Sequence, residues 1–224
     1  MICPHHEKLY GRRKCRQLTK KQKELFDTVL PDISITAFRQ SNFGNYAHVF
    51  LEIGFGMGCH IAQLALSTPN ALFVGCEPFV NGVAALLVKI SDLGIKNIRI
   101  FQGDARILLQ DIQSNSLDGV FLLFPDPWPK RKHTGRRFLQ ERTIETIHDK
   151  LKVGGWFRIA TDHEVYIQWM LRLFGRPKFD KLFTGILVGK NSRPDENSWP
   201  KTKYERIATN EILFATYTKI EPYV

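Results

Sequence analysis

From residue 49 onward, short apolar runs that end in glycine or acidic residues alternate with longer segments of helical periodicity. The apolar runs predict seven strands, over residues 49–53, 72–76, 98–101, 119–123, 156–160, 179–183 and 212–218. The longer segments predict helices over residues 58–66, 80–93, 105–110, 138–150 and 164–174. Strands that are apolar along their whole length, such as 119–123, are typical of a parallel sheet covered on both faces. The pattern therefore predicts a three-layer α/β fold.

Two segments depart from this alternation. The chain up to residue 24 carries many basic side chains and few apolar ones, which predicts a mobile basic arm, either a solvated tail or an RNA contact. Residues 191–203 are rich in proline, asparagine and serine and predict a loop. No repeat or linker divides the chain further. We therefore expect a basic N-terminal extension over residues 1–40 and one domain over residues 41–224.

The composition indicates which classes of partner and which cellular compartment to expect. The chain has 224 residues, with 32 Lys and Arg against 22 Asp and Glu, and the net charge of +10 favours nucleic acid first and an anionic membrane second. The four cysteines show no C-x-x-C spacing, and no stretch reaches the ~18 apolar residues of a membrane helix. We expect a cytoplasmic protein with no membrane partner. We also expect no metal, because Cys3, His5, His6 and Cys15 lack the spacing of a structural zinc site.

Three glycines alternate between the first predicted strand and the helix that follows it. Gly54, Gly56 and Gly58 leave room for a ligand to approach the backbone closely. Their spacing differs from the G-x-G-x-x-G of dinucleotide-binding folds, so a nucleoside without a diphosphate fits better.

Acidic residues lie at the ends of three successive predicted strands, at the same edge of the sheet. Glu77, after the second strand, is placed to accept hydrogen bonds from ribose hydroxyls, and Asp104, after the third, from an adenine amino group. Glu52 lies next to the glycine turn. The alternative is that Glu52 and Asp104 only cap the following helices. Carboxylates suit S-adenosylmethionine, which carries a sulfonium cation and no phosphate.

The fourth predicted strand is followed by Phe124-Pro125-Asp126-Pro127-Trp128-Pro129-Lys130, and then by a basic run to Arg137. Prolines restrict this corner, and in an open α/β sheet it must emerge at the ligand-binding edge. Asp126 is therefore expected to face both the methyl donor and the acceptor.

Five motifs in this order resemble the bacterial tRNA (guanine-N7)-methyltransferases, which modify guanosine 46 in the variable loop. The motifs are Leu-Glu-Ile-Gly-Phe-Gly-Met-Gly from Leu51, Gly103-Asp104-Ala105, Phe-Pro-Asp-Pro-Trp-Pro-Lys from Phe124, Thr161-Asp162-His163 and Thr202-Lys203-Tyr204-Glu205. The resemblance covers nearly the whole chain. It implies a Rossmann-like class I methyltransferase fold, with a seven-stranded, mostly parallel sheet whose last strand is antiparallel.

The resemblance also implies roles for individual residues. S-adenosyl-L-methionine would contact the glycine turn and Glu52, Glu77, Asp104 and Asp126, and Asp126 would be the catalytic residue. The target nucleotide would contact Lys130, Asp162, Thr202, Lys203, Tyr204 and Glu205. The tRNA partner would contact Lys132, His133, Arg136 and Arg137. One departure is Glu77-Pro78-Phe79, where the family often has a histidine after the acidic residue.

The implied chemistry needs no general base, because guanine N7 carries a lone pair and no proton. Alignment of the two reactants, which contributes on the order of 7–11 kcal/mol, becomes the principal requirement. Either Asp126 or Asp162 would accept from guanine N1–H or N2 and offset the developing charge. Trp128 would either stack on a base or anchor the corner. His133 is expected at the surface or on a phosphate rather than as an acid or base.

Three alternatives remain at this stage. Asp126-Pro127-Trp128 is similar to the Asp/Asn-Pro-Pro-aromatic corner of exocyclic-amine methyltransferases, although the following Pro129-Lys130 argues against this. A non-catalytic RNA-binding protein is the second alternative, and donor binding would count against it. A nicotinamide-dependent oxidoreductase is the third, and the glycine spacing disfavours it. No obligate protein partner is inferred, and the sequence leaves the oligomeric state undetermined.

Overall fold

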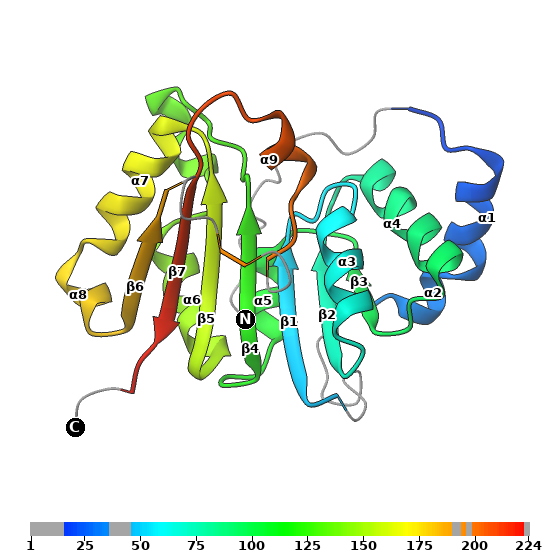
Figure 1. Ribbon diagram of the computed structural model, residues 1–224, viewed down its shortest axis with the longest axis horizontal. Helices are drawn as coiled ribbons and strands as arrows, with labels where there is room; N and C mark the ends of the chain where they lie inside the picture. The colour runs from blue at the N-terminus through cyan, green and yellow to red at the C-terminus, as the bar shows by residue number, and fades with distance from the viewer. Residues whose placement is uncertain (1–15, 36–45, 190–193, 196–198, 222–224) are drawn as a thin grey trace, which may run out of the picture.

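A computed structural model describes residues 16–35, 46–189, 194–195 and 199–221. One seven-stranded sheet runs through the molecule in the order β3-β2-β1-β4-β5-β7-β6 (Figure 1). The strands are β1 (His48–Ile53), β2 (Ala71–Cys76), β3 (Ile98–Phe101), β4 (Leu117–Leu123), β5 (Leu151–Thr161), β6 (Phe183–Val188) and β7 (Leu213–Lys219). The first five pair in parallel, and β7 pairs antiparallel with both β5 and β6. The predicted mixed sheet with an antiparallel last strand is confirmed.

Helices cover both faces of the sheet, so the predicted three layers are confirmed (Figure 1). The longer ones are α3 (Cys59–Ser67), α4 (Val80–Leu93), α5 (Ala105–Asp111), α6 (Glu141–Lys150) and α7 (Glu164–Phe174). One core cluster joins the sheet to α5, α6 and α7, and the other joins it to α3 and α4. All six residues of β2 are buried, which explains why its sequence lacks a polar alternation.

The N-terminal segment is folded onto the domain where the structure describes it. Helices α1 (Lys20–Thr28) and α2 (Leu30–Ile33) follow a capping box between Thr19 and Gln22, and α1 packs against α4. Leu25 is 7% exposed within the second core cluster. The prediction of a mobile arm is wrong for residues 16–24, because the apolar face of α1 packs against α4. Residues 1–15 and the predicted boundary at 40/41 lie outside the described residues.

The predicted strand at 179–183 is also wrong. Phe179 lies in a short helix, α8 (Pro177–Asp180), where Pro177 starts the helix and Phe179 is buried. The strand itself, β6, begins at Phe183. It lies at the edge of the sheet, where four consecutive residues are exposed, among them the apolar Ile186 and Leu187. The predicted loop at 191–203 is confirmed at its described positions up to Thr202, and Lys203 begins α9 (Lys203–Ile207).

Candidate functional site

A cavity of about 550 Å³ lies at the carboxyl ends of β1 to β4, within the ~300–1,000 Å³ range of ligand pockets. We call it the donor cavity. Its lining includes Gly54, Gly56, Glu77, Asp104 and Asp126. The sequence analysis placed the ligand at this edge of the sheet, and the structure brings these predicted residues together there.

The glycine turn between β1 and α3 needs glycine for two separate reasons. Gly54, Gly56 and Gly58 all have positive φ angles, of 72°, 55° and 70°, which side chains rarely tolerate. At Gly58 a Cβ atom would also lie 2.8 Å from the side chain of Leu86. The turn therefore brings bare backbone to the donor cavity and lets α3 start close to α4.

Glu77 ties two turns of the site together. Its carboxylate accepts from the backbone N–H of Gly56 at 2.8 Å and from that of Phe79 at 2.9 Å. Burial raises the pKa of Glu77, the two backbone N–H groups lower it in part, and the charges of Asp126 and Glu52 raise it further. Each carboxylate oxygen keeps a second lone pair, so Glu77 can still accept from a ligand hydroxyl. Phe79 stands where the resemblance leads us to expect histidine. It contributes its backbone N–H to the Glu77 carboxylate.

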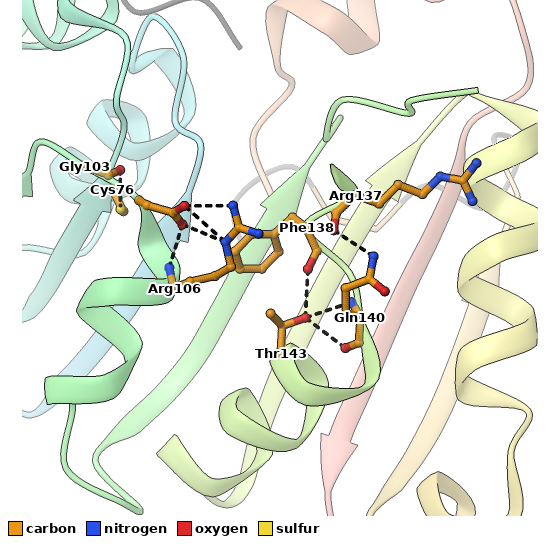
Figure 2. A network of polar contacts seen from close by, with 8 residues as sticks. Cys76, Gly103, Arg106, Arg137, Phe138, Gln140 and Thr143 are labelled. Carbon is orange, nitrogen blue, oxygen red and sulfur yellow. Dashed lines mark hydrogen bonds and ion pairs between the residues drawn. The ribbon is translucent and has the colours of Figure 1, made fainter. Parts of the chain in front are cut away.

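Asp104 caps a helix and also lies on the donor cavity. It caps α5 by accepting from the backbone N–H of Arg106 at 2.9 Å, and it pairs with the Arg106 guanidinium at 2.8 Å. It also lines the donor cavity. The Cys76 thiol donates to the Gly103 carbonyl at a distance of 3.3 Å (Figure 2). Helix capping is therefore confirmed for Asp104, and donor binding stays a prediction.

Glu52 does not line the donor cavity. It lies 4% exposed on a second cavity of about 70 Å³, the small cavity, and contacts His60 there. Helix α3 is capped by Gly58, so the capping alternative is wrong for Glu52. The two cavities adjoin, because Gly54, Leu123, Phe124 and Tyr204 line both.

The proline corner after β4 is held by a buried arginine. Phe124 and Trp128 have positive φ angles of 50° and 40°. The Arg137 guanidinium, in a residue only 3% exposed, donates to the carbonyls of Pro127 at 3.0 Å and Trp128 at 3.1 Å. It also lies 4.8 Å from the ring centre of Trp169. Asp126, at the turn of this corner, is exposed at the mouth of the donor cavity.

This burial corrects the predicted RNA contact of Arg137, because its guanidinium already binds the corner's own carbonyls. The Arg137 carbonyl meanwhile accepts from Gln140, which with Thr143 forms the capping box that starts α6 (Figure 2). Nothing in a run of basic residues distinguishes Arg137 from its neighbours, so the sequence carries no signal for this role.

The other basic residues after the corner lie on a short 3₁₀ helix, η2 (Arg131–Arg136). Lys130 and Lys132 are exposed, and Arg136 lies 5.0 Å from the ring centre of Trp128. His133 packs edge-on against the same ring at 5.7 Å. Desolvation and the charges of Arg136, Lys132 and Lys130 lower the pKa of His133. Trp128 is half-buried and lines the donor cavity, so it both anchors η2 and faces the site.

The segment before β7 reaches over the site from the other side. Thr202 caps α9 by accepting from the Glu205 backbone N–H at 3.0 Å, and Tyr204 stacks on Phe124 at 5.9 Å. Tyr204 lines both cavities, and Lys203 lines the small one. Lys130, Asp162 and Glu205 lie outside both linings.

A buried tryptophan that the sequence did not predict anchors this segment. Trp199 is 1% exposed and packs edge-on against Phe121 and Phe214. Arg158 lies 5.4 Å from the ring centre of Trp199 and 4.1 Å from that of Trp156, and burial lowers its pKa to about 10. A tryptophan in a proline-rich stretch is the signal that could have indicated this anchor.

The described residues were also compared with the requirements of a metal site and of a membrane-spanning helix. Within the described ranges, no group of three or more His, Cys, Asp or Glu residues is arranged to hold a metal ion, and Cys3, His5, His6 and Cys15 lie outside those ranges. No helix in the part of the chain that the structure describes is long and apolar enough to cross a membrane.

Comparison with known proteins places the chain among methyltransferases. The model of a family described as putative methyltransferase matches residues 46–212. The tRNA (guanine-N(7)-)-methyltransferase of Zymomonas mobilis is 39% identical over 95% of this chain and 94% of its own length. That of Erythrobacter litoralis is 39% identical over 90% of this chain and 88% of its own.

Solved structures at lower identity share the fold alone. An rRNA methylase from Streptococcus thermophilus matches with a TM-score of 0.55 and 14% identity, over 92% of this chain and 100% of that one. The 16S rRNA methyltransferase KamB matches with a TM-score of 0.57 and 14% identity, over 83% and 95%. The fold is therefore that of Rossmann-like methyltransferases.

Proposed function

The chain belongs to the tRNA (guanine-N(7)-)-methyltransferase family, and we propose that it methylates N7 of a guanosine in tRNA, at position 46 of the variable loop. It is a methyltransferase whose methyl donor is S-adenosylmethionine. One observation carries the proposal: the donor cavity has carboxylates at three strand ends, and it opens at Asp126 beside the basic helix η2. A tRNA substrate also makes the cytoplasm the expected compartment.

The donor's adenosine end belongs at the edge formed by β2 and β3. Glu77 is already oriented by two backbone N–H groups and accepts from the ribose hydroxyls with its remaining lone pairs. Asp104 is the nearest carboxylate for the adenine amino group, although Arg106 shares its oxygens. The sulfonium then lies between these residues and the glycine turn, where the cavity is lined by Gly54 and Phe124.

Methyl transfer from this position needs alignment rather than proton removal. The N7 lone pair forms the new N–CH3 bond while the S–CH3 bond breaks, and its electron pair returns to sulfur. The donor leaves as neutral S-adenosylhomocysteine, and the guanine gains a positive charge. A carboxylate close to the purine stabilises that charge and fixes the base in line with the methyl group. Asp126 suits this role better than Asp162, because Asp126 lines the donor cavity and Asp162 does not.

The RNA backbone would meet the basic residues beside the corner. Lys130, Lys132, His133 and Arg136 lie on or next to η2, within one short segment of Asp126. Contacts of this kind fix the register of the RNA and release counterions. The segment Thr202–Glu205 would close over the target nucleotide from the opposite side, where Tyr204 already rests on Phe124.

The proposal is tested with the purified protein, unmodified tRNA and S-adenosylmethionine labelled in its methyl group. After digestion to nucleosides, mass spectrometry should find the label in 7-methylguanosine. A tRNA carrying adenosine at position 46 should take up none. Label in an exocyclic-amine methyl group would favour the first alternative, and donor binding without transfer would favour a non-catalytic RNA-binding protein.

A further inference from the structure

The small cavity has a buried acid and a buried histidine on its lining. Glu52 is the penultimate residue of β1 and His60 lies in the first turn of α3, and the two residues are 4% and 3% exposed. The Nδ1 atom of His60 lies 2.7 Å from the Glu52 carboxylate. The predicted site included Glu52, whereas neither the motifs nor the proposed chemistry gave His60 a role.

The surroundings of His60 define its tautomer. A carboxylate only accepts hydrogen bonds, so the proton of this bond is carried by Nδ1. Nε2 is buried and has no hydrogen-bond partner among the described residues. The ring packs edge-on against Phe121 at 4.7 Å. A proton on Nε2 would be a buried donor without an acceptor, which is costly. The Nδ1–H tautomer therefore donates to Glu52 and places no proton on the buried Nε2.

The small cavity lies where the amino-acid end of the donor must go. It shares Gly54, Leu123, Phe124 and Tyr204 with the donor cavity, on the side away from Glu77 and Asp104. Its volume of about 70 Å³ corresponds to about two water molecules at ~30 Å³ each, enough for a group of a few atoms. Glu52 lines it with a carboxylate and Lys203 with an ammonium. These two charges complement the α-ammonium and the α-carboxylate of an amino acid.

We infer that His60 is a positioning residue for the methyl donor, and that it acts through Glu52. Its Nδ1–H fixes one carboxylate oxygen, so the other faces the small cavity and receives the α-ammonium of S-adenosylmethionine. This inference rests on the proposed function for the identity of the donor. The contact through His60 and Glu52 affects only ligands that have an amino-acid end. Contacts to the adenosine affect ligands with or without that end.

Two ligands separate this role from a general effect on the fold. S-adenosylhomocysteine carries the amino-acid end, and 5′-methylthioadenosine shares the adenosine and thioether but lacks it. His60→Phe keeps an aromatic ring but removes the N–H, and His60→Asn keeps an N–H near the position of Nδ1. By isothermal titration calorimetry, His60→Phe should bind S-adenosylhomocysteine at least about tenfold more weakly. Its affinity for methylthioadenosine should change by less than about twofold, and His60→Asn should restore most of the difference.

A matched control lies at the other end of the same strand. His48 also contacts a carboxylate through Nδ1, that of Asp118 at 3.0 Å, but at the start of β1 and away from both cavities. His48→Phe should leave both affinities unchanged. In a Glu52→Gln background, His60→Phe should no longer weaken S-adenosylhomocysteine further, because its partner is already neutral.

Equal weakening of both ligands, or a full His60→Phe effect in the Glu52→Gln background, would overturn the inference. If His60→Phe does not fold, NMR of the wild-type protein with 15N-labelled histidine gives an independent answer. The His60 ring nitrogens should show the Nδ1–H tautomer and shift with S-adenosylhomocysteine but not with methylthioadenosine. Failure of the proposed function is seen separately, as absence of 7-methylguanosine from tRNA treated with the wild-type protein.

Discussion

The carboxylates of Asp104 and Asp126 line one cavity but differ in how firmly the protein holds them. Asp104 is 8% exposed and bonds both the backbone and the guanidinium of Arg106. Asp126 is exposed at the mouth, on a corner that the prolines and Arg137 keep in place. A fixed, buried carboxylate suits recognition of a bound ligand, and an exposed one at the mouth suits contact with an incoming base.

This difference predicts separable effects of two substitutions. Asp126→Ala should lower kcat by about 10²–10³, the range seen when one transition-state contact is removed, and should largely keep donor binding. Asp104→Ala should weaken donor binding first. Methyl-transfer kinetics and calorimetry with S-adenosylhomocysteine measure the two effects. Asp162→Ala is the comparison for Asp126, and unchanged turnover in Asp126→Ala would refute its role.

The buried carboxylate of Glu77 predicts a pH-dependent stability. Burial raises its pKa above the ordinary value of 4.5, so the native state holds this proton more tightly than the unfolded chain. The corresponding stabilisation is complete below the unfolded pKa and is lost as pH rises through the native one. Glu77→Gln cannot ionise, so its stability relative to wild type should improve as pH rises from about 4. Urea titrations between pH 4 and 8 measure this difference, and a difference independent of pH would contradict it.

Among the elements, the corner after β4 depends on a contact with α7. Arg137 bonds two carbonyls of the corner and lies on the ring of Trp169, whose indole N–H donates to the Leu139 carbonyl at 2.7 Å. The corner that carries Asp126 is therefore braced by the helix layer on that face of the sheet. Two residues with positive φ angles make such bracing necessary, because the strained backbone would otherwise relax.

Neighbouring arginines should accordingly behave differently when substituted. Arg137→Met should lower the free energy of unfolding by about 2 kcal/mol, because it removes buried hydrogen bonds to two carbonyls. Arg136→Met should leave stability nearly unchanged and weaken tRNA binding. Urea unfolding and filter binding of tRNA distinguish the two variants. If Arg137→Met is as stable as the wild type but binds tRNA more weakly, Arg137 contacts RNA and the conclusion drawn from its burial is wrong.

The elements that could be predicted from the sequence are those buried on two sides or amphipathic along their length. The expected helices at 80–93 and 164–174 and the strand at 98–101 agree with α4, α7 and β3 to the residue. α8 could not be predicted, because a four-residue helix has no period, and the strand predicted over residues 179–183 overlaps β6 only at Phe183. At the site, strand-end acids stand out in a sequence, but Arg137 and His60 act through partners that only folding brings close.

Over the whole molecule, the charge of +10 favours long-range attraction of RNA, and the proposed function places the RNA backbone on the basic residues around η2. The described part of the N-terminal segment adds α1, whose Lys20 and Lys23 are exposed on the other side of the molecule from α7 (Figure 1). The electrostatic contribution to tRNA binding therefore combines a local cluster near Asp126 with charges elsewhere on the surface.

The salt dependence of tRNA binding should separate these contributions. Lys130→Ala and Lys132→Ala should each reduce the slope of log affinity against log salt by about 1, the value for one lost phosphate contact. Lys152→Ala is the matched control, because Lys152 pairs with Asp118 near the start of β4, at the opposite edge of the sheet. Binding measured between about 50 and 200 mM salt gives the slopes. Equal slopes for Lys130→Ala, Lys132→Ala and Lys152→Ala would place the RNA elsewhere.

The position of β7 has a consequence for how the molecule is made. β7 lies between β5 and β6 but leaves the ribosome after both, so β6 has no neighbour in the sheet until residues 213–219 have been synthesised. During that interval the nascent chain exposes one unpaired edge of β5 and the whole of β6, which invites pairing with other chains. The segment anchored by Trp199 arrives in the same interval, immediately before β7. Methyl transfer must therefore await the synthesis of residues 213–219, when one strand completes the sheet and brings α9 over the cavity.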